Sequence, residues 1–124
     1  MHNIIRIVFL ATLALSTSAC LAPGLYQWGD YEQGLYSAYK DPTQVESLRK
    51  KLENHILEME QTGQKVAPGL YAEVGTFYLQ AGSPEQAIAM YAKERDAWPE
   101  SKGLMTAMIQ NLEKRQKAKR ESSK

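Results

Sequence analysis

Cysteine and histidine are scarce in this chain of 124 residues, which contains one cysteine and two histidines. The single cysteine, Cys20, excludes an internal disulfide, and the scarcity of both residues argues against a zinc site. An excess of one charge is also missing, since 15 basic residues accompany 14 acidic ones. A near-neutral chain has no electrostatic footprint for nucleic acid, so we exclude that class of partner.

A long hydrophobic run is absent as well. The apolar stretch IVFLATLAL covers only residues 7–15, well short of the roughly 20 residues that a membrane-spanning helix needs. Arg6 precedes it, and the small residues 16–19 follow it directly before Cys20. A basic start, a short apolar run and small residues before a cleavage point predict a secretory signal peptide over residues 1–19.

The stretch TSAC at residues 17–20 resembles a bacterial lipobox, although Thr17 stands where Leu is usual. The resemblance implies that Cys20 is lipidated and becomes the new N-terminus. Leu21 rather than Asp follows it, which in lipoprotein sorting implies the outer membrane, with the protein facing the periplasm. Several acyl chains on Cys20 would hold the chain there, and residues 20–27 would form a lipidated tether.

The remaining sequence favours helix. Val45, Leu48, Leu52, Ile56 and Met59 recur at spacings of three and four, the mark of an amphipathic helix, and no alternating strand pattern occurs. Pro and Gly mark the breaks between helices. We expect an all-α domain over residues 28–118 with five helices, near 31–40, 43–61, 70–80, 84–97 and 101–114. Beyond Lys114 the pattern becomes polar and basic, so we expect fraying and a flexible basic tail over residues 119–124.

One segment, residues 68–101, resembles a tetratricopeptide repeat, a pair of antiparallel helices with residues of fixed type at fixed spacing. Eight residues fall in those slots: Tyr71, Val74, Gly75, Tyr78, Gly82, Ala87, Tyr91 and Pro99. Glu94 departs from the pattern, because the repeat normally has Ala there.

Each of these slots has a packing reason. Gly75 and Ala87 are small where the two helices would approach closely, and Tyr78 and Tyr91 would fill the gap between the helices. Gly82 suits the left-handed turn between them, and Pro99 would end the second helix.

The opening segment is similar to the second half of such a hairpin, because Gly29, Gly34 and Leu35 align with Gly82, Ala87 and Ile88. We therefore expect a partial repeat, a long helix, one complete repeat and a capping helix. Repeat hairpins usually bind through the first helix, which implies a partner-binding face made of Gly69, Ala72, Thr76 and Leu79. The alternative is that the neighbouring helices of the chain fill that groove.

Five aromatic residues gather close behind the cysteine: Tyr26, Trp28, Tyr31, Tyr36 and Tyr39. They suit either a platform for cell-wall glycan or peptide, or packing between helices. Tyr31 and Tyr39 share a helical face with Leu35, which favours packing for these two tyrosines. For Trp28 packing is less favoured than for these tyrosines, because a Trp near an anchored N-terminus could also lie at a lipid headgroup. Trp28 is also a candidate partner-binding residue.

Catalytic chemistry finds little support. His2 lies in the predicted signal peptide, which leaves His55 alone near the apolar stripe of its helix. No serine stands in a nucleophile-elbow pattern, and no glycine-rich loop follows a strand. We expect no enzyme, no metal and no cofactor.

Together, the lipobox, the segment LYQWGDYEQGLYSAYKDP and the hairpin resemble a family of small proteobacterial outer-membrane lipoproteins of unknown function. Members of that family are encoded beside a lipoprotein similar to the curli secretion pore, which implies a shared envelope complex. The sequence thus predicts a lipid-anchored periplasmic adaptor that binds other envelope lipoproteins. The alternative function is a module that binds cell-wall glycan or peptide.

Overall fold

The computed structural model describes residues 24–123, and every regular element in that part of the chain is a helix. The elements are α2 (Tyr31–Lys40), η2 (Pro42–Gln44), α3 (Val45–Gln61), α4 (Leu70–Gln80), α5 (Pro84–Ala97), η3 (Pro99–Ser101) and α6 (Lys102–Ser122). The prediction of an all-α fold with five α-helices is confirmed over this range. The predicted signal peptide and Cys20 lie outside the described residues.

The breaks between helices lie where proline and glycine predicted them. Asp41 ends α2, and its carboxylate accepts a hydrogen bond of 3.0 Å from the backbone N–H of Thr43, with Pro42 at the first position of η2. Gly63 follows α3 with a φ of 68°, and Gly82 precedes α5 with a φ of 77°. A side chain is strained in this left-handed region, so glycine permits the turns at both places.

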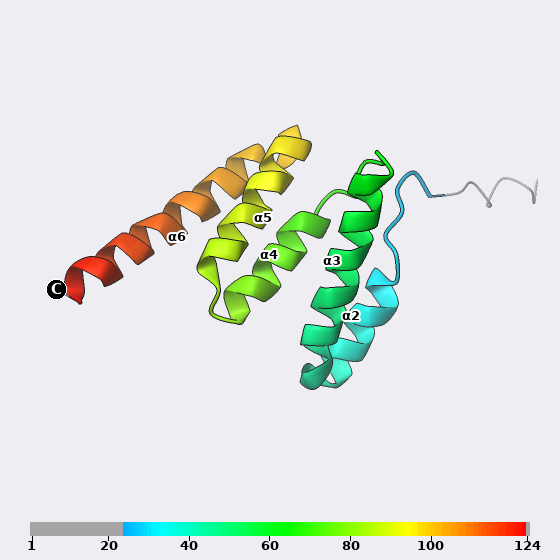
Figure 1. The fold of residues 1–124 in the computed structure, drawn as a ribbon, viewed down its shortest axis with the longest axis horizontal. Coiled ribbons are helices and arrows are strands. Elements are labelled where there is room, and N and C mark those ends of the chain that lie inside the picture. The colour runs from blue at the N-terminus through cyan, green and yellow to red at the C-terminus, as the bar shows by residue number, and fades with distance from the viewer. Residues whose placement is uncertain (1–23, 124) are drawn as a thin grey trace, which may run out of the picture.

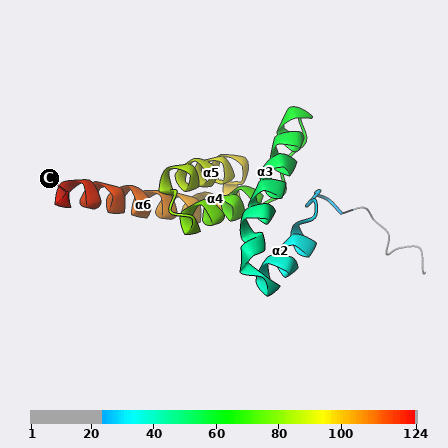
Figure 2. The same cartoon turned by 60° about the horizontal axis from the view of Figure 1, so that its bottom comes forward.

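The helices form a row in which each packs mainly against its neighbours in sequence: α2 on α3, α3 on α4, α4 on α5 and α5 on α6. Helices α4 and α5 make an antiparallel hairpin (Figure 1). In both views α2 lies at one end of the row and the C-terminal part of α6 extends from the other (Figure 2). Within residues 24–123, α2 and α6 therefore each pack on one neighbouring α-helix and have a face that no other described helix covers.

Two hydrophobic clusters hold the row together, and they meet at α4. The first lies between α2, α3 and α4, and its buried members are Ala38, Leu48, Leu52, Ile56, Met59, Val66, Ala67, Leu70, Tyr71, Val74 and Phe77. The second lies between α5 and α6 and consists of Ala87, Tyr91, Met105, Ile109 and Leu112. Tyr78 of α4 packs against both clusters and so connects them.

The C-terminal end differs from the prediction. We expected fraying beyond Lys114 and a flexible tail from residue 119, but α6 continues to Ser122. The segment is rich in Lys, Arg, Glu, Gln and Ala, which are strong helix formers even without an apolar stripe. Lys119 and Arg120 lie in the last turn, where cations stabilise the negative end of the helix dipole.

Candidate functional site

Helices α4 and α5 approach each other most closely at Gly75. A Cβ atom added there would lie 2.8 Å from Cε1 of Tyr91 and 3.2 Å from the carbonyl oxygen of Ala87. Tyr91 and Ala87 are both fully buried. Gly75, Ala87 and Tyr91 thus meet where α4 and α5 pack against each other. Helix α5 ends at Ala97, just before Pro99, as predicted.

The face predicted to bind a partner is partly covered by the chain itself. Ala72 and Leu79 pack against the second cluster, which α5 and α6 supply. Thr76 Oγ1 donates a hydrogen bond of 2.9 Å to the carbonyl of Ala72 and lies 3.2 Å from the hydroxyl oxygen of Tyr91. With Gly69 these residues remain half-buried. The structure thus leaves a shallow strip along α4 rather than a deep groove.

Glu94, the residue that departs from the repeat pattern, is buried with an exposed fraction of 1%. Its Oε1 accepts hydrogen bonds from the backbone N–H of Gly69 at 2.8 Å and from the hydroxyl of Ser101 at 3.0 Å. Gly69 is the N-cap residue of α4, and Ser101 is the N-cap residue of α6. A carboxylate is favourable at the positive end of a helix, so Glu94 joins two helix N-termini that lie far apart in sequence. Its mismatch with the pattern was the only signal for this role.

A seam of tyrosine–glutamate pairs between α3 and α4 was missed by sequence reasoning. Tyr71 donates to Oε1 of Glu60 at 2.8 Å, and Tyr78 donates to Oε1 of Glu53. Both tyrosines and both glutamates are seven residues apart, so the pairs repeat after two turns of two antiparallel helices. We expected Tyr78 to fill the gap between α4 and α5. Its hydroxyl is instead directed to α3, because the acceptor carboxylate is there.

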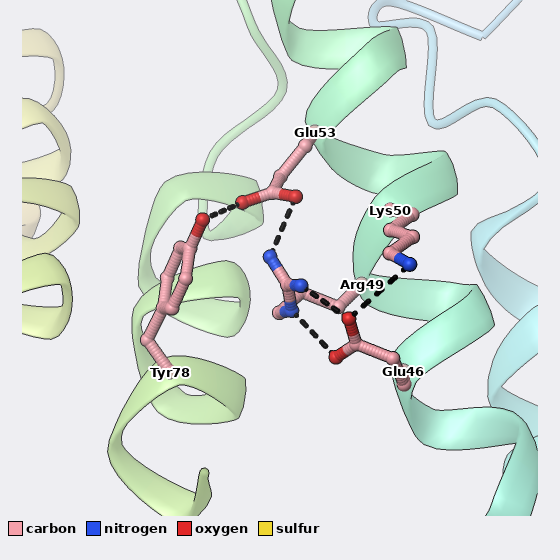
Figure 3. A network of polar contacts seen from close by, with 5 residues as sticks. All are labelled: Glu46, Arg49, Lys50, Glu53 and Tyr78. Atoms are coloured by element: carbon pink, nitrogen blue, oxygen red, sulfur yellow. Dashed lines mark hydrogen bonds and ion pairs between the residues drawn. The ribbon is translucent and has the colours of Figure 1, made fainter. Parts of the chain in front are cut away.

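Charged residues extend this seam, as Figure 3 shows. Arg49 donates to Glu53 at 2.7 Å and pairs with Glu46, and its guanidinium lies 4.6 Å from the centre of the Tyr78 ring. At the other end, Lys93 of α5 lies 2.8 Å from Glu60. The seam therefore links α3 to both helices of the hairpin.

The pKa values of the seam follow from these contacts. The hydrogen bond to Glu53 is the main cause of a raised pKa for Tyr78, and burial is the main cause for Tyr71. The hydrogen bond from Lys93 is the main cause of a lowered pKa for Glu60. At neutral pH the tyrosines thus stay protonated as donors and Glu60 stays ionised as an acceptor.

We expect Tyr78→Phe to lower the free energy of unfolding by about 1 kcal/mol, because it removes one hydrogen bond and keeps the ring. Urea unfolding followed by circular dichroism measures the change. In a double-mutant cycle with Glu53→Gln, the double variant should lose less free energy of unfolding than the sum of the two single losses. Tyr36→Phe, which changes an exposed tyrosine, is the matched control. Equal losses in Tyr78→Phe and Tyr36→Phe would contradict the assignment.

Glu73 of α4 is half-buried, and burial raises the pKa of its carboxyl group. Raising the pKa of an acid means that the folded state favours the protonated form, so Glu73 disfavours folding once it ionises. We expect Glu73→Gln to stabilise the protein at pH 7, and the advantage to disappear below about pH 4, where glutamate is protonated in both states. Urea midpoints of both proteins across pH 3.5–7 test this, and an advantage that persists at low pH would contradict it.

The aromatic residues near the N-terminus have several different environments. Tyr26 packs edge-on against Trp98 with ring centres 5.3 Å apart, and Tyr31 is half-buried against the first cluster. Trp28 has an exposed fraction of 40%, and its ring centre lies 6.1 Å from that of Tyr31. Tyr39 is 86% exposed, so the expectation that it packs between helices is wrong.

Helix α2 packs through its smallest residues instead. Ala38 is buried, and a Cβ atom at Gly34 would clash with Cδ1 of Leu48 on α3. These residues let the two backbones approach closely. Tyr39 then lies outside the contact.

An open surface pocket of about 340 Å³ lies between the segment just before α2 and the middle of α3. His55 lines this pocket, and its Nε2 lies 3.0 Å from the carbonyl oxygen of Gln27. The ring of His55 also packs against Gly29, whose φ is 59°. His55 thus positions the segment before α2 on α3. Within residues 24–123, no three His, Cys, Asp or Glu side chains gather as a metal site would require.

None of the helices that the structure describes is both long enough and apolar enough to cross a membrane.

Residues 25–108 match a domain of unknown function, DUF4810. The chain belongs to the DUF4810 family. The DUF4810 domain covers α2, α3, the α4–α5 hairpin and the first part of α6. The searches of curated proteins and of solved structures returned no match.

Proposed function

We propose that the protein is a lipid-anchored adaptor on the periplasmic face of the outer membrane, where it binds other envelope lipoproteins. The observation that carries the proposal is the row of helices, in which each helix packs mainly on its sequence neighbours and both end helices keep an uncovered face. Helical repeats of this kind gain stability by stacking and offer extended surfaces to partners.

The details of α4 and α5 support a repeat of the tetratricopeptide type. Gly75 permits the close contact with Tyr91, and Gly82 makes the turn, as that repeat requires. The partial repeat has support too, since Gly29 and Gly82 both have positive φ values two residues before a helix, α2 and α5 respectively.

The partner-binding surface that we propose is the half-exposed strip of α4 formed by Gly69, Ala72, Thr76 and Leu79. Small residues there would let a helix or an extended peptide lie close to the backbone of α4. The partner class is a second envelope lipoprotein, and the family resemblance favours one similar to the curli secretion pore.

Crosslinking in cells tests the adaptor. A photo-crosslinking residue at Gln80, exposed next to the strip, is expected to capture the same envelope lipoproteins in repeated experiments. Ala72→Trp should reduce that capture severalfold, because a large ring would fill the strip. The matched control is Ala89→Trp on the exposed side of α5, and circular dichroism verifies that both variants fold. Equal capture by both variants would overturn the assignment of the strip, and the absence of any reproducible partner would overturn the adaptor.

The anchor has a separate test. Palmitate labelling of the protein in cells is expected to disappear in Cys20→Ala, because lipidation requires the thiol. Labelling that persists in Cys20→Ala would refute the anchor without touching the proposed partner surface.

A further inference from the structure

Large apolar side chains are exposed mainly at one end of the protein. Seven such side chains are exposed in the described residues, and five of them fall between residues 25 and 39: Leu25, Trp28, Leu35, Tyr36 and Tyr39. Single exposed apolar residues are common on proteins, but a group of this kind marks a contact surface.

Three of the five form one face of α2. Leu35 and Tyr39 are four residues apart, and Tyr36 and Tyr39 are three apart, so Tyr39 is a neighbour of both on the helix surface. Their exposed fractions are 40%, 86% and 57%. Gly34 and Ala38, on another side of α2, pack on α3. Within residues 24–123 no other helix covers the aromatic face.

The position of this face in the chain indicates what covers it. Leu25 follows Cys20 by five residues, which an extended chain spans in about 17 Å, and Trp28 follows by eight, or about 28 Å. A lipidated Cys20 would therefore hold both side chains within reach of the bilayer surface. Segment 24–30 and α2 lie at the same end of the molecule, opposite the C-terminal part of α6 (Figures 1 and 2).

We propose that Leu25, Trp28 and the aromatic face of α2 rest in the headgroup region of the membrane. Trp and Tyr favour that region because their rings are apolar while their N–H and O–H groups can bond to water and phosphate. The inference rests on the lipid anchor of the proposed function. It gives the anchored domain a fixed orientation, in which α2 is at the membrane and the α4 strip and α6 are farther along the row of helices.

The charges around the face suit a shallow contact. The ammonium group of Lys40 lies 4.6 Å from the centre of the Tyr36 ring and is available to lipid phosphate. Glu32, one turn before Tyr36, is exposed and carries a negative charge. A carboxylate is costly in hydrocarbon, so the rings sit among the headgroups rather than among the acyl chains.

Tryptophan quenching tests the contact. The full lipidated protein is reconstituted into vesicles of phosphatidylethanolamine and phosphatidylglycerol, with or without phospholipids brominated near the headgroup. Trp28→Phe isolates the signal of Trp98, which is buried. The difference between wild type and Trp28→Phe gives the Trp28 signal, which we expect brominated lipid to reduce by about twofold, as for a ring at the interface.

Two variants show whether the face of α2 makes the contact. Tyr36→Glu combined with Tyr39→Glu should abolish the quenching of Trp28 while the protein still floats with the vesicles through its lipid. Leu57→Glu changes an exposed leucine on α3, outside the face, and should leave the quenching unchanged.

The outcomes separate the inference from the anchor and the adaptor. Flotation without quenching of Trp28, or quenching that survives the paired tyrosine substitutions, overturns the membrane contact and leaves the anchor intact. Failure to float overturns the anchor and the contact together. A third outcome would assign the face to glycan instead. In that case the protein sediments with purified peptidoglycan, the paired substitutions abolish this sedimentation, and lipid does not quench Trp28. Crosslinking of a partner at Gln80 is measured separately and tests the adaptor independently of these outcomes.

Discussion

Gly75→Val is expected to lower the free energy of unfolding by about 3 kcal/mol, the upper part of the range for overpacked cores. The reason is the distance of 2.8 Å between an added Cβ and Cε1 of Tyr91, whose side chain is fully buried. The carbonyl of Ala87, at 3.2 Å, belongs to the backbone of α5, so relief requires the two helices to separate. Thermal and urea unfolding followed by circular dichroism measure the loss.

The control for this prediction is Gly103→Val in the first turn of α6, where an added Cβ meets nothing within 4 Å. At this position the same substitution should change the free energy of unfolding by no more than about 0.5 kcal/mol, as is usual for surface substitutions. Tyr91→Ala alone should cost about 3–5 kcal/mol, and its combination with Gly75→Val should cost less than the two losses added. Additive losses, or equal effects at Gly75 and Gly103, would contradict the close contact.

Glu94→Ala is expected to lower the free energy of unfolding by about 2–3 kcal/mol, since hydrogen bonds to a charged group contribute about 1.5–3 kcal/mol. The substitution leaves Gly69 N–H and the Ser101 hydroxyl without their shared acceptor and opens space at a site that is 1% exposed. Because Glu94 connects the starts of α4 and α6, hydrogen exchange should increase in the first turns of both helices.

Two further variants make this prediction specific. Glu94→Gln keeps the shape and one acceptor oxygen and should lose less than Glu94→Ala, because both hydrogen bonds can still form to a neutral acceptor. Glu113→Ala changes an exposed glutamate of α6 and should be neutral within about 0.5 kcal/mol. If the repeat pattern alone governed this position, Glu94→Ala would stabilise the protein, and that outcome would refute the capping role.

The helices and their breaks could be predicted from the sequence because they depend on local chemistry. Pro42 and Gly82 restrict or permit backbone angles whatever surrounds them, and the stripe from Val45 to Met59 marks a helix by its spacing alone. The contact of Gly75 with Tyr91 was predictable as well. It lies within one hairpin, where the turn at Gly82 brings the two residues together.

The surfaces could not be predicted to the same degree. Tyr31 and Tyr39 occupy the same helical stripe, yet Tyr31 is half-buried and Tyr39 is exposed. Periodicity shows which residues share a face, and only the position of α3 decides which part of that face is covered. The exposure of the strip with Ala72 and Leu79 also depends on helix packing, because α5 and α6 cover part of it.

By itself, the sequence determined the all-α class, the helix boundaries up to α6 and the packing of the α4–α5 hairpin, since these follow from backbone angles and short-range spacing. Only the tertiary structure decided that Tyr71 and Tyr78 bond to α3, that Glu94 joins α4 to α6, and that the aromatic face of α2 stays open. Each of these depends on contacts between residues far apart in the chain, whose geometry is set by how whole helices pack.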